Sequence, residues 1–341
     1  MRVLIIGAGV AGLAAAICAR RAGCEATVIE RRGTRDVSAR DAHVHRLPPK
    51  SQAQLTQISS AVGQDGLDAA ARFGAAQGGA IDWQGRQSLF RLGDLEASLH
   101  KSAVANGVEL AYGQNALALR TADDGWRLEV EAGRAFAADL LIDASGAHRT
   151  GIDLLGDRLP DVPLDDIDAP ERHVSWRART AADDPVLIAW SDETVNGLLQ
   201  VGADGRVQLT ARTGLGVGLT LERAREAVQT AGGDSLARRL AQIRFEPRGV
   251  QHTSAGVRRV ALEEVDVGGL PPFALVGDAL IEAPPRYGEG VGRAFDQALM
   301  LEDLLRKGQA ADCAATLAEQ AKAHWAGYGV AMSLRPLASV R

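Results

Sequence analysis

The sequence predicts an α/β fold, in which a parallel sheet built from both ends of the chain is interrupted by a mainly antiparallel sheet. Three observations predict it. A glycine-rich turn at residues 7–12 joins a short apolar run to an alanine-rich helix, and a second apolar run at 273–276 ends in Gly277 and Asp278. Between them, from about residue 173 to 213, apolar and polar residues alternate as they do in antiparallel strands.

The composition is that of a soluble globular protein with a full core. The chain has 341 residues, of which 46% are apolar and 24% charged, enough for one large or two joined domains. A formal net charge of -5 argues against nucleic acid or an anionic membrane as a partner, since both attract basic surfaces. No run of apolar residues is long enough to span a membrane. Cys18, Cys24 and Cys313 lack metal-ligand spacing, which favours reduced core thiols and a cytoplasmic location.

The N-terminus reads as a βαβ unit. A strand is expected over Arg2–Ile6, a helix over Gly12–Ala22 and a second strand over Glu25–Glu30. The apolar run that reaches Ala19 is not read as a secretory signal, because glycines at turn spacing interrupt it and a second strand follows at once.

The remaining elements follow from periodicity and turn residues. We expect helices over 50–62, 66–76, 94–107, 220–231, 234–242, 290–305 and 311–328. Strands are expected over 108–114, 126–133 and 138–146, a hairpin over 79–93, and antiparallel strands over 173–180, 186–191, 196–202 and 206–213.

The first glycine turn predicts a dinucleotide site. Gly7, Gly9 and Gly12 allow a tight turn and a close approach to a pyrophosphate, and the helix that follows offers its N-terminal amides. Glu30, at the end of the second strand, would accept hydrogen bonds from an adenosine ribose, or would be a solvated strand end. A carboxylate there disfavours a 2'-phosphate, so the ligand is FAD or NAD and not NADP. The nearby arginines would contact adenine or phosphate, or form a solvated face: Arg31, Arg32 and Arg35.

The C-terminal motif separates FAD from NAD. Asp278 follows a strand, where open α/β sheets bind ligands, and its carboxylate suits the hydroxyls of a ribityl chain, which NAD lacks. Pro284 and Pro285 stiffen the next loop. Gly288 to Gly290 then begin a helix whose amides would stabilise an anionic reduced flavin. The alternative is a glycine-rich turn before an amphipathic helix, with no ligand.

Taken together, these motifs resemble a known family. GAGVAG with Glu30, Arg91 before DLEASL, DLLIDASG and ALVGDALIEAPPRYGEGVGRAFDQA are similar to FAD-dependent monooxygenases of the aromatic hydroxylase type, over about residues 1–150 and 265–310. Their nucleotide fold is glutathione-reductase-like, or Rossmann-like. The resemblance implies that the three glycines bind the pyrophosphate and that Arg91 reaches the phosphate or ribityl region. It also implies a set of residues that line the flavin ring: Pro284 or Pro285, Gly288, Gly290 and Val291.

The chain departs from the family pattern in three places. The family often has Gly-Asp-Ala-Ala-His where this chain has Gly-Asp-Ala-Leu, ending at Leu280. Gly292 stands where the family frequently has asparagine. The fingerprint that often ends in Asp-Gly ends here in the tetrapeptide 143–146, Asp-Ala-Ser-Gly. That ending is similar to the branch that contains prenyl-lipid reductases, halogenases and styrene-type monooxygenases.

Two further segments supply candidate residues. The run RDAHVHRL at 40–47 resembles a segment that follows the second strand in some of these flavoproteins, where Arg40 or Arg46 would neutralise the pyrophosphate. His43 and His45 lie at i, i+2, on the same side of a strand, so metal binding has to be considered. No carboxylate or cysteine ligand pattern accompanies them, and we therefore predict no metal. The alternatives for these histidines are a position near the flavin or an ordinary place at the surface. Arg286 and Tyr287 are substrate-side residues or pack the loop.

We therefore expect an FAD-binding domain at 1–165 and 266–341, with a substrate-binding β-sheet domain at 166–265. The function expected is that of an FAD-dependent monooxygenase, which uses reduced flavin and O2 to hydroxylate or epoxidise a small molecule or a peptide. The alternatives are a reductase, a halogenase, or a flavin-binding protein without turnover. With one dinucleotide loop, electrons come from transiently bound NAD(P)H or from a partner flavin reductase.

Overall fold

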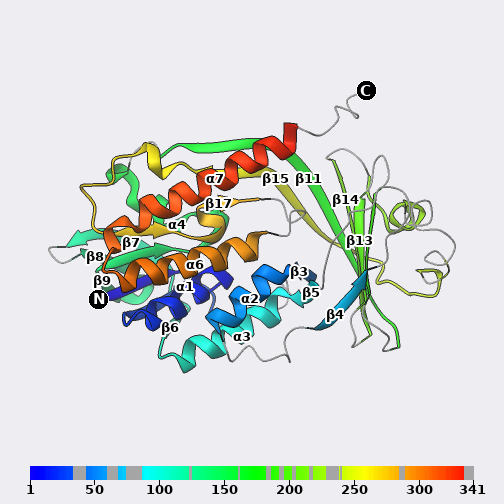
Figure 1. Cartoon of the computed structure of the whole chain (residues 1–341), viewed down its shortest axis with the longest axis horizontal. Helices are drawn as coiled ribbons and strands as arrows, with labels where there is room; N and C mark the ends of the chain where they lie inside the picture. The colour runs from blue at the N-terminus through cyan, green and yellow to red at the C-terminus, as the bar shows by residue number, and fades with distance from the viewer. Residues whose placement is uncertain are drawn as a thin grey trace.

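The computed structural model describes residues 1–33, 44–59, 68–73, 87–122, 125–159, 162–181, 186–191, 196–201, 205–214, 218–227, 238, 240–283 and 289–333. These residues form two main bodies of structure. One surrounds the N-terminus, and the other is a large sheet at the opposite end of the molecule (Figure 1).

A five-stranded parallel sheet forms the centre of the first body. Its order is β16-β10-β1-β2-β6, with β1 at Arg2–Ile6, β2 at Glu25–Glu30, β6 at Glu109–Tyr112, β10 at Leu140–Asp143 and β16 at Phe273–Leu275. The central strands are apolar and buried along nearly their whole length, as expected when both faces of a parallel sheet are covered. The expected parallel sheet from both ends of the chain is confirmed, because β16 lies beside β10 and β10 beside β1.

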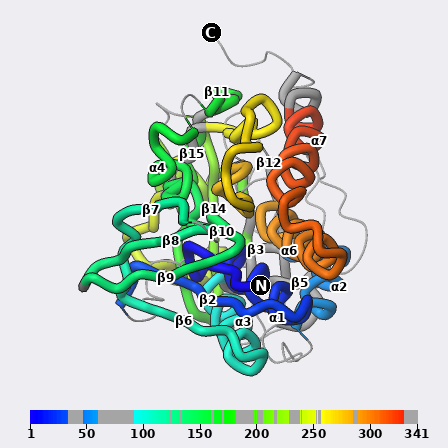
Figure 2. Tube along the Cα trace, turned by 90° about the vertical axis from the view of Figure 1, so that its left-hand side faces the viewer, coloured from blue at the N-terminus to red at the C-terminus, as the bar shows by residue number. Residues whose placement is uncertain are grey.

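Helices and a small sheet cover the parallel strands. Helix α1 (Val10–Arg21) packs against α3 (Leu92–Ala105) and α6 (Gly290–Arg306), and α7 (Cys313–Ser333) contacts α6 and β16. On the other side a three-stranded antiparallel sheet contacts β1 and β10 (Figure 2). Its strands are β7 (Ala116–Ala122), β8 (Gly125–Val130) and β9 (Ala135–Ala138). The buried side chains of Trp126 and Leu128 on β8 join the main core.

The second body is a nine-stranded sheet of order β17-β15-β11-β14-β13-β12-β4-β5-β3. Its strands lie at β3 Val44–Leu47, β4 Asp68–Phe73, β5 Gln87–Arg91, β11 Leu164–Arg179, β12 Val186–Ser191, β13 Asn196–Val201, β14 Arg206–Gly214, β15 Val250–Val260 and β17 Ile281–Glu282. The alternation in β11 puts Val174 and Trp176 on one face, where they form a second core with β14 and the helical segment at 221–227. The long strands β11 and β15 reach from this sheet back to the first body (Figure 1).

Most expected elements are confirmed within the described residues, including the four antiparallel strands, and one is wrong. Residues 68–73, placed in a helix over 66–76, form strand β4. The three alanines of DAAARF favour a helix, but β4 pairs with β5 on one side and with β12 on the other, and this pairing overrides the local propensity. Two further helices of the described residues are α2 (Pro49–Ile58) and the short α4 (Thr150–Leu155).

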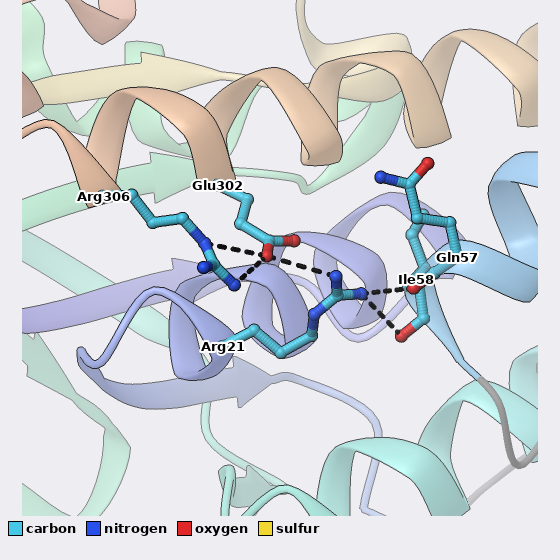
Figure 3. Close-up of polar contacts among 5 residues, drawn as sticks. All are labelled: Arg21, Gln57, Ile58, Glu302 and Arg306. Carbon is cyan, nitrogen blue, oxygen red and sulfur yellow. Dashed lines mark hydrogen bonds and ion pairs between the residues drawn. The ribbon is translucent and has the colours of Figure 1, made fainter.

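A charged clamp fixes α1, α2 and α6 to one another (Figure 3). Arg21, at the end of α1, forms an ion pair of 3.2 Å with Glu302 of α6 and donates to the last carbonyls of α2, at Gln57 and Ile58. Arg306 also pairs with Glu302, at 2.6 Å. Arg21 thereby satisfies carbonyls that the end of α2 leaves unpaired.

The three thiols are free and buried, as expected for core cysteines. Burial, followed by the nearby charge of Asp312, raises the pKa of Cys313 to about 12. Among the described residues, no helix is both long and apolar enough to cross a membrane.

Candidate functional site

A cleft of about 340 Å³ opens at the carboxyl ends of the parallel strands. The segments that follow all five strands line it, as the crevice of an open α/β sheet requires. They include Gly7 and Gly9 after β1, Glu30 to Arg32 at β2, Gln114 to Ala116 after β6, Ala144 to Gly146 after β10, and Gly277 and Asp278 after β16. The start of α6 completes the wall with Glu289, Gly290, Val291 and Ala294. Motifs from both ends of the chain therefore meet in one cleft.

The first glycine turn is shaped by close backbone contacts. Gly7 has a φ of 106° and donates its N–H to the carbonyl of Ile29 at 2.8 Å. A Cβ at Gly7 would lie 2.5 Å from the carbonyl oxygen of Ala144, and one at Gly12 would overlap the carbonyl of Gly7. Gly9 precedes α1, and no side chain of the described residues caps it. The first-turn amides of α1 thus remain available for an anion at the cleft.

Glu30 is buried and its carboxylate accepts four hydrogen bonds from within the chain. Oε2 accepts from the N–H of Ala8 at 2.9 Å and from Nη2 of Arg32 at 3.0 Å. Oε1 accepts from the N–H and Nε of Arg32, at 3.0 and 2.9 Å. Burial raises the pKa of this carboxyl, but the hydrogen bonds from Arg32 and Ala8 outweigh it and lower the pKa to about 2. Glu30 is therefore a fixed anion at one end of the cleft.

A second arginine bridges two of the lining segments. Nη2 of Arg31, beyond β2, lies 3.1 Å from Nε2 of His148, in the short helical turn beyond β10. Both residues line the cleft. Their contact holds the two loops together beside the glycine turn.

Asp143, the last residue of β10, organises the loop that follows. Its carboxylate is buried and accepts the N–H groups of Ser145 at 2.9 Å and Gly151 at 2.7 Å. Burial raises its pKa, although the hydrogen bonds from Ser145 and Gly151 act in the opposite direction. The Asp-Ala-Ser-Gly ending thus serves to fold the loop against the cleft.

The C-terminal motif is fixed against α1 and α6. Gly277 has a φ of 63°, and a Cβ there would lie 2.7 Å from that of Ala11. Its N–H donates to Oε1 of the buried Gln297 at 2.6 Å. Asp278 is exposed and lines the cleft. Burial, followed by the nearby charge of Asp278, raises the pKa of Glu282. The carboxylates of Glu30 and Asp278 therefore line the same cleft from opposite ends of the chain.

The start of α6 carries a network to the C-terminal helix. Tyr328 of α7 donates a hydrogen bond to Oε2 of Glu289 at 2.8 Å and accepts one from Nη1 of the buried Arg293. Nη2 of Arg293 also donates to the carbonyl of Ile281 at 3.2 Å. Gly292 packs on α2, where a Cβ would meet Oγ of Ser51.

Several predicted site residues lie outside the described part of the chain: Arg40, His43, Pro284, Pro285, Arg286, Tyr287 and Gly288. For Arg91, His45 and Arg46 only the backbone is described. It places Arg91 opposite Val44, and His45 opposite Phe90, in the β3–β5 pair. Arg91 immediately precedes Leu92, the first residue of α3, which lines the cleft.

The sequence analysis missed other lining residues, including Gln114, Asn115 and His148. Their positions after β6 and β10 could have found them, because every loop at this edge of a parallel sheet points to the crevice. Tyr328 and Arg293 carried no local signal, since their contact joins residues on two different helices.

The cleft fits FAD. Glycines without room for side chains lie beside the α1 amides, as a pyrophosphate requires, and the carboxylates of Glu30 and Asp278 line the cleft as acceptors for the hydroxyl groups of a ligand. If bound there, the flavin would supply the redox chemistry, and the protein would supply position and electrostatics.

Comparisons with known proteins also point to a flavin-binding fold. A family model described as FAD dependent oxidoreductase matches residues 2–148. No sequence of a curated protein matches the chain. Among solved structures, P. aeruginosa PqsL in complex with 2-aminobenzoylacetate has a TM-score of 0.74 at 17% identity, covering 94% of this chain and 91% of its own.

Two other structures share the fold. CtdE in complex with FAD and a substrate has a TM-score of 0.68 at 15% identity, covering 94% of this chain and 84% of its own. The flavin-dependent brominase Bmp2 has a TM-score of 0.67 at 14% identity, with coverages of 91% and 80%. Residues 2–148 therefore carry the sequence pattern of an FAD dependent oxidoreductase, on a fold that the chain as a whole shares with flavin-dependent enzymes.

Proposed function

We propose that the protein is an FAD-dependent monooxygenase that hydroxylates or epoxidises an organic substrate. The observation that carries the proposal is the placement of Glu30 and Asp278 in one cleft, with the glycine turn of Gly7 to Gly12 in its wall. A ligand that uses both carboxylates has a ribose and a second polyhydroxylated chain. FAD has both, and NAD has only riboses.

The residues of the chain would divide the work along the cleft. The α1 amides would hold the pyrophosphate, and Glu30 the adenosine ribose. Asp278 would accept the ribityl hydroxyls, and Gly290 and Val291 would border the ring. The proposed cofactor-binding set also includes Arg40, Arg91, Pro285 and Gly288. The residues proposed to lie beside the reacting centre are Pro284, Tyr287 and His45. The substrate-binding domain proposed at 166–265, which supplies the long strands of the nine-stranded sheet, would cover the substrate.

The fold neighbours support small organic molecules as the substrate class, since PqsL and CtdE are each crystallised with one. Electrons would come from NAD(P)H that binds transiently or from a partner flavin reductase. A second candidate is a halogenase, which the fold of Bmp2 favours.

The test begins with purified protein reconstituted with FAD. Its absorbance spectrum, and chromatography of the chromophore after denaturation, should identify FAD at one equivalent per chain. NAD(P)H oxidation is then followed with and without a panel of aromatic and lipid substrates, under isotopically labelled O2 and with or without bromide. Label in the product supports a monooxygenase, and bromide-dependent product supports the halogenase. Failure to bind FAD overturns both.

A further inference from the structure

Arg293 is a buried cation that forms no ion pair with any residue in the described part of the chain. The residue is 2% exposed. Its hydrogen-bond acceptors are neutral, namely the hydroxyl of Tyr328 and the carbonyl of Ile281. Its Nε is buried and has no acceptor in the structure. Within the described part of the chain, no carboxylate lies within ion-pair distance of this guanidinium.

A second buried guanidinium among the described residues does have ion-pair partners. Arg259 is 3% exposed, and it pairs with both Asp165 and Glu263. Removing a charge from water is unfavourable, so buried charges are normally paired. An unpaired buried cation is therefore costly to the apoprotein, and an anion that binds nearby would recover part of that cost.

The position of Arg293 shows where such an anion would lie. Its Nη2 is 3.9 Å from the place that a Cβ on Gly290 would occupy, and Gly290 lines the cleft. The guanidinium therefore lies close to the backbone of a residue that lines the cleft. The N-terminus of α6 lies at the same turn and adds its own partial positive charge.

The negatively charged side chain of Glu289 lies near the Arg293 guanidinium and opposes its effect on the potential at the cleft. Glu289 precedes α6, is exposed and lines the cleft. Tyr328 donates to Glu289 and accepts from Arg293, so this one hydroxyl from the C-terminal helix holds both charges in place. The local potential at the cleft is thus the difference between two fixed charges of opposite sign.

We propose that Arg293 stabilises negative charge on the reduced flavin ring, and that Tyr328 restrains Glu289 so that its carboxylate offsets this effect only in part. The proposal rests on the proposed function, because it requires FAD in the cleft. Charge near the ring of a flavin changes its electronic properties, and a buried charge is screened less by solvent than an exposed one. Arg293 acts here through space as a positioning and electrostatic residue.

The test measures the flavin itself and not turnover. Sulfite adds to the oxidised ring, where its sulfur forms a bond to a ring nitrogen and its electron pair leaves the ring anionic. Its dissociation constant and the midpoint potential both report stabilisation of a negative ring. In Arg293→Gln we expect sulfite to bind about tenfold more weakly and the potential to fall, because one close positive charge is lost. Arg293→Lys should restore most of the affinity.

Glu289→Gln should act in the opposite direction, with tighter sulfite binding and a higher potential. Tyr328→Phe should loosen Glu289 and lower the potential. Arg306→Gln, which removes the same charge from the exposed far end of α6, is the matched control and should change neither quantity. If Arg293→Gln does not fold, the exposed Glu289 carries the test through its own variant.

The inference is overturned if FAD-loaded Arg293→Gln has the sulfite dissociation constant and the midpoint potential of the parent. Where that variant does not fold, parent values in Glu289→Gln overturn it. That outcome leaves the proposed function standing. If the parent protein itself does not bind FAD, the proposed function fails first, and the inference fails with it.

Discussion

The side-chain oxygen of Gln297 accepts the backbone N–H of Gly277 at 2.6 Å, and both residues are buried. This bond joins α6 to the turn that presents Asp278. Gln297→Leu should lower the free energy of unfolding by about 1–3 kcal/mol, because the buried N–H loses its acceptor. Urea denaturation of the apoprotein measures it. Gln309→Leu, on the exposed loop before α7, is the control, and an equal loss in both variants would contradict the role assigned to Gln297.

Asp278→Ala tests the ribityl end of the cleft. We expect the variant to bind FAD about ten- to a hundredfold more weakly while it stays folded, because charge-assisted hydrogen bonds to the ribityl hydroxyls are lost. Fluorescence titration of the apoprotein with FAD measures the dissociation constant. Asp153→Ala on α4 removes an exposed carboxylate and should bind FAD like the parent. Unchanged affinity in Asp278→Ala would place the ribityl chain elsewhere.

Glu30 predicts a dependence of stability on acid pH. Its folded pKa of about 2 lies below the ordinary 4.5, so its contribution is present above pH 4.5 and is lost as the pH falls through 2. The shift corresponds to roughly 3 kcal/mol at neutral pH. Unfolding free energies from pH 2 to 7 should therefore fall less steeply below pH 4.5 in Glu30→Gln. Glu129→Gln, from an exposed ion pair, should keep the parent slope.

His173 predicts a second dependence at higher pH. Burial, with a smaller effect from the charge of Arg212, lowers its pKa to about 4, whereas the unfolded chain takes up the proton near 6.5. Stability should therefore fall between pH 6.5 and 4, at most by about 1.4 kcal/mol per pH unit for one proton. His173→Gln should flatten this part of the profile. Should His100→Gln on α3 flatten it equally, the assignment to His173 is wrong.

The clamp at Arg21 predicts unequal effects of two similar arginines. Arg21→Met loses the ion pair to Glu302 and the bonds to the α2 carbonyls, a cost of roughly 1.5–3 kcal/mol. Arg306→Met loses one pair of a side chain that is 55% exposed, at a cost below about 1 kcal/mol. Thermal and urea denaturation compare the two. A cost for Arg306→Met equal to that for Arg21→Met would remove the α2 carbonyls from the explanation.

The five parallel strands and strands β12, β13 and β14 could be predicted because their sequence repeats match a single environment, whereas no strand was expected at β7, β9 or β15. The apolar runs before Gly7 and Gly277 are buried on both faces, and β14 alternates because one face meets a core. Residues 68–73 were assigned to the wrong element because their strand is made by partners at β5 and β12, which local propensity does not report.

The candidate site was predictable to the extent that strand ends decide it. Glu30 and Asp278 follow parallel strands, and the sheet edge brings them to one cleft. The bond from Arg31 to His148 and the Tyr328 network depend on tertiary packing between distant segments. No periodicity encodes such pairs.

The order of the parallel strands also governs biogenesis. Chains fold from the N-terminus as they are synthesised. Strand β1 takes its neighbour β10 about 135 residues later, and the cleft wall is closed by residues near 290. A nascent chain that has already exposed its first glycine turn therefore has no complete cleft until the residues near 290 have been added.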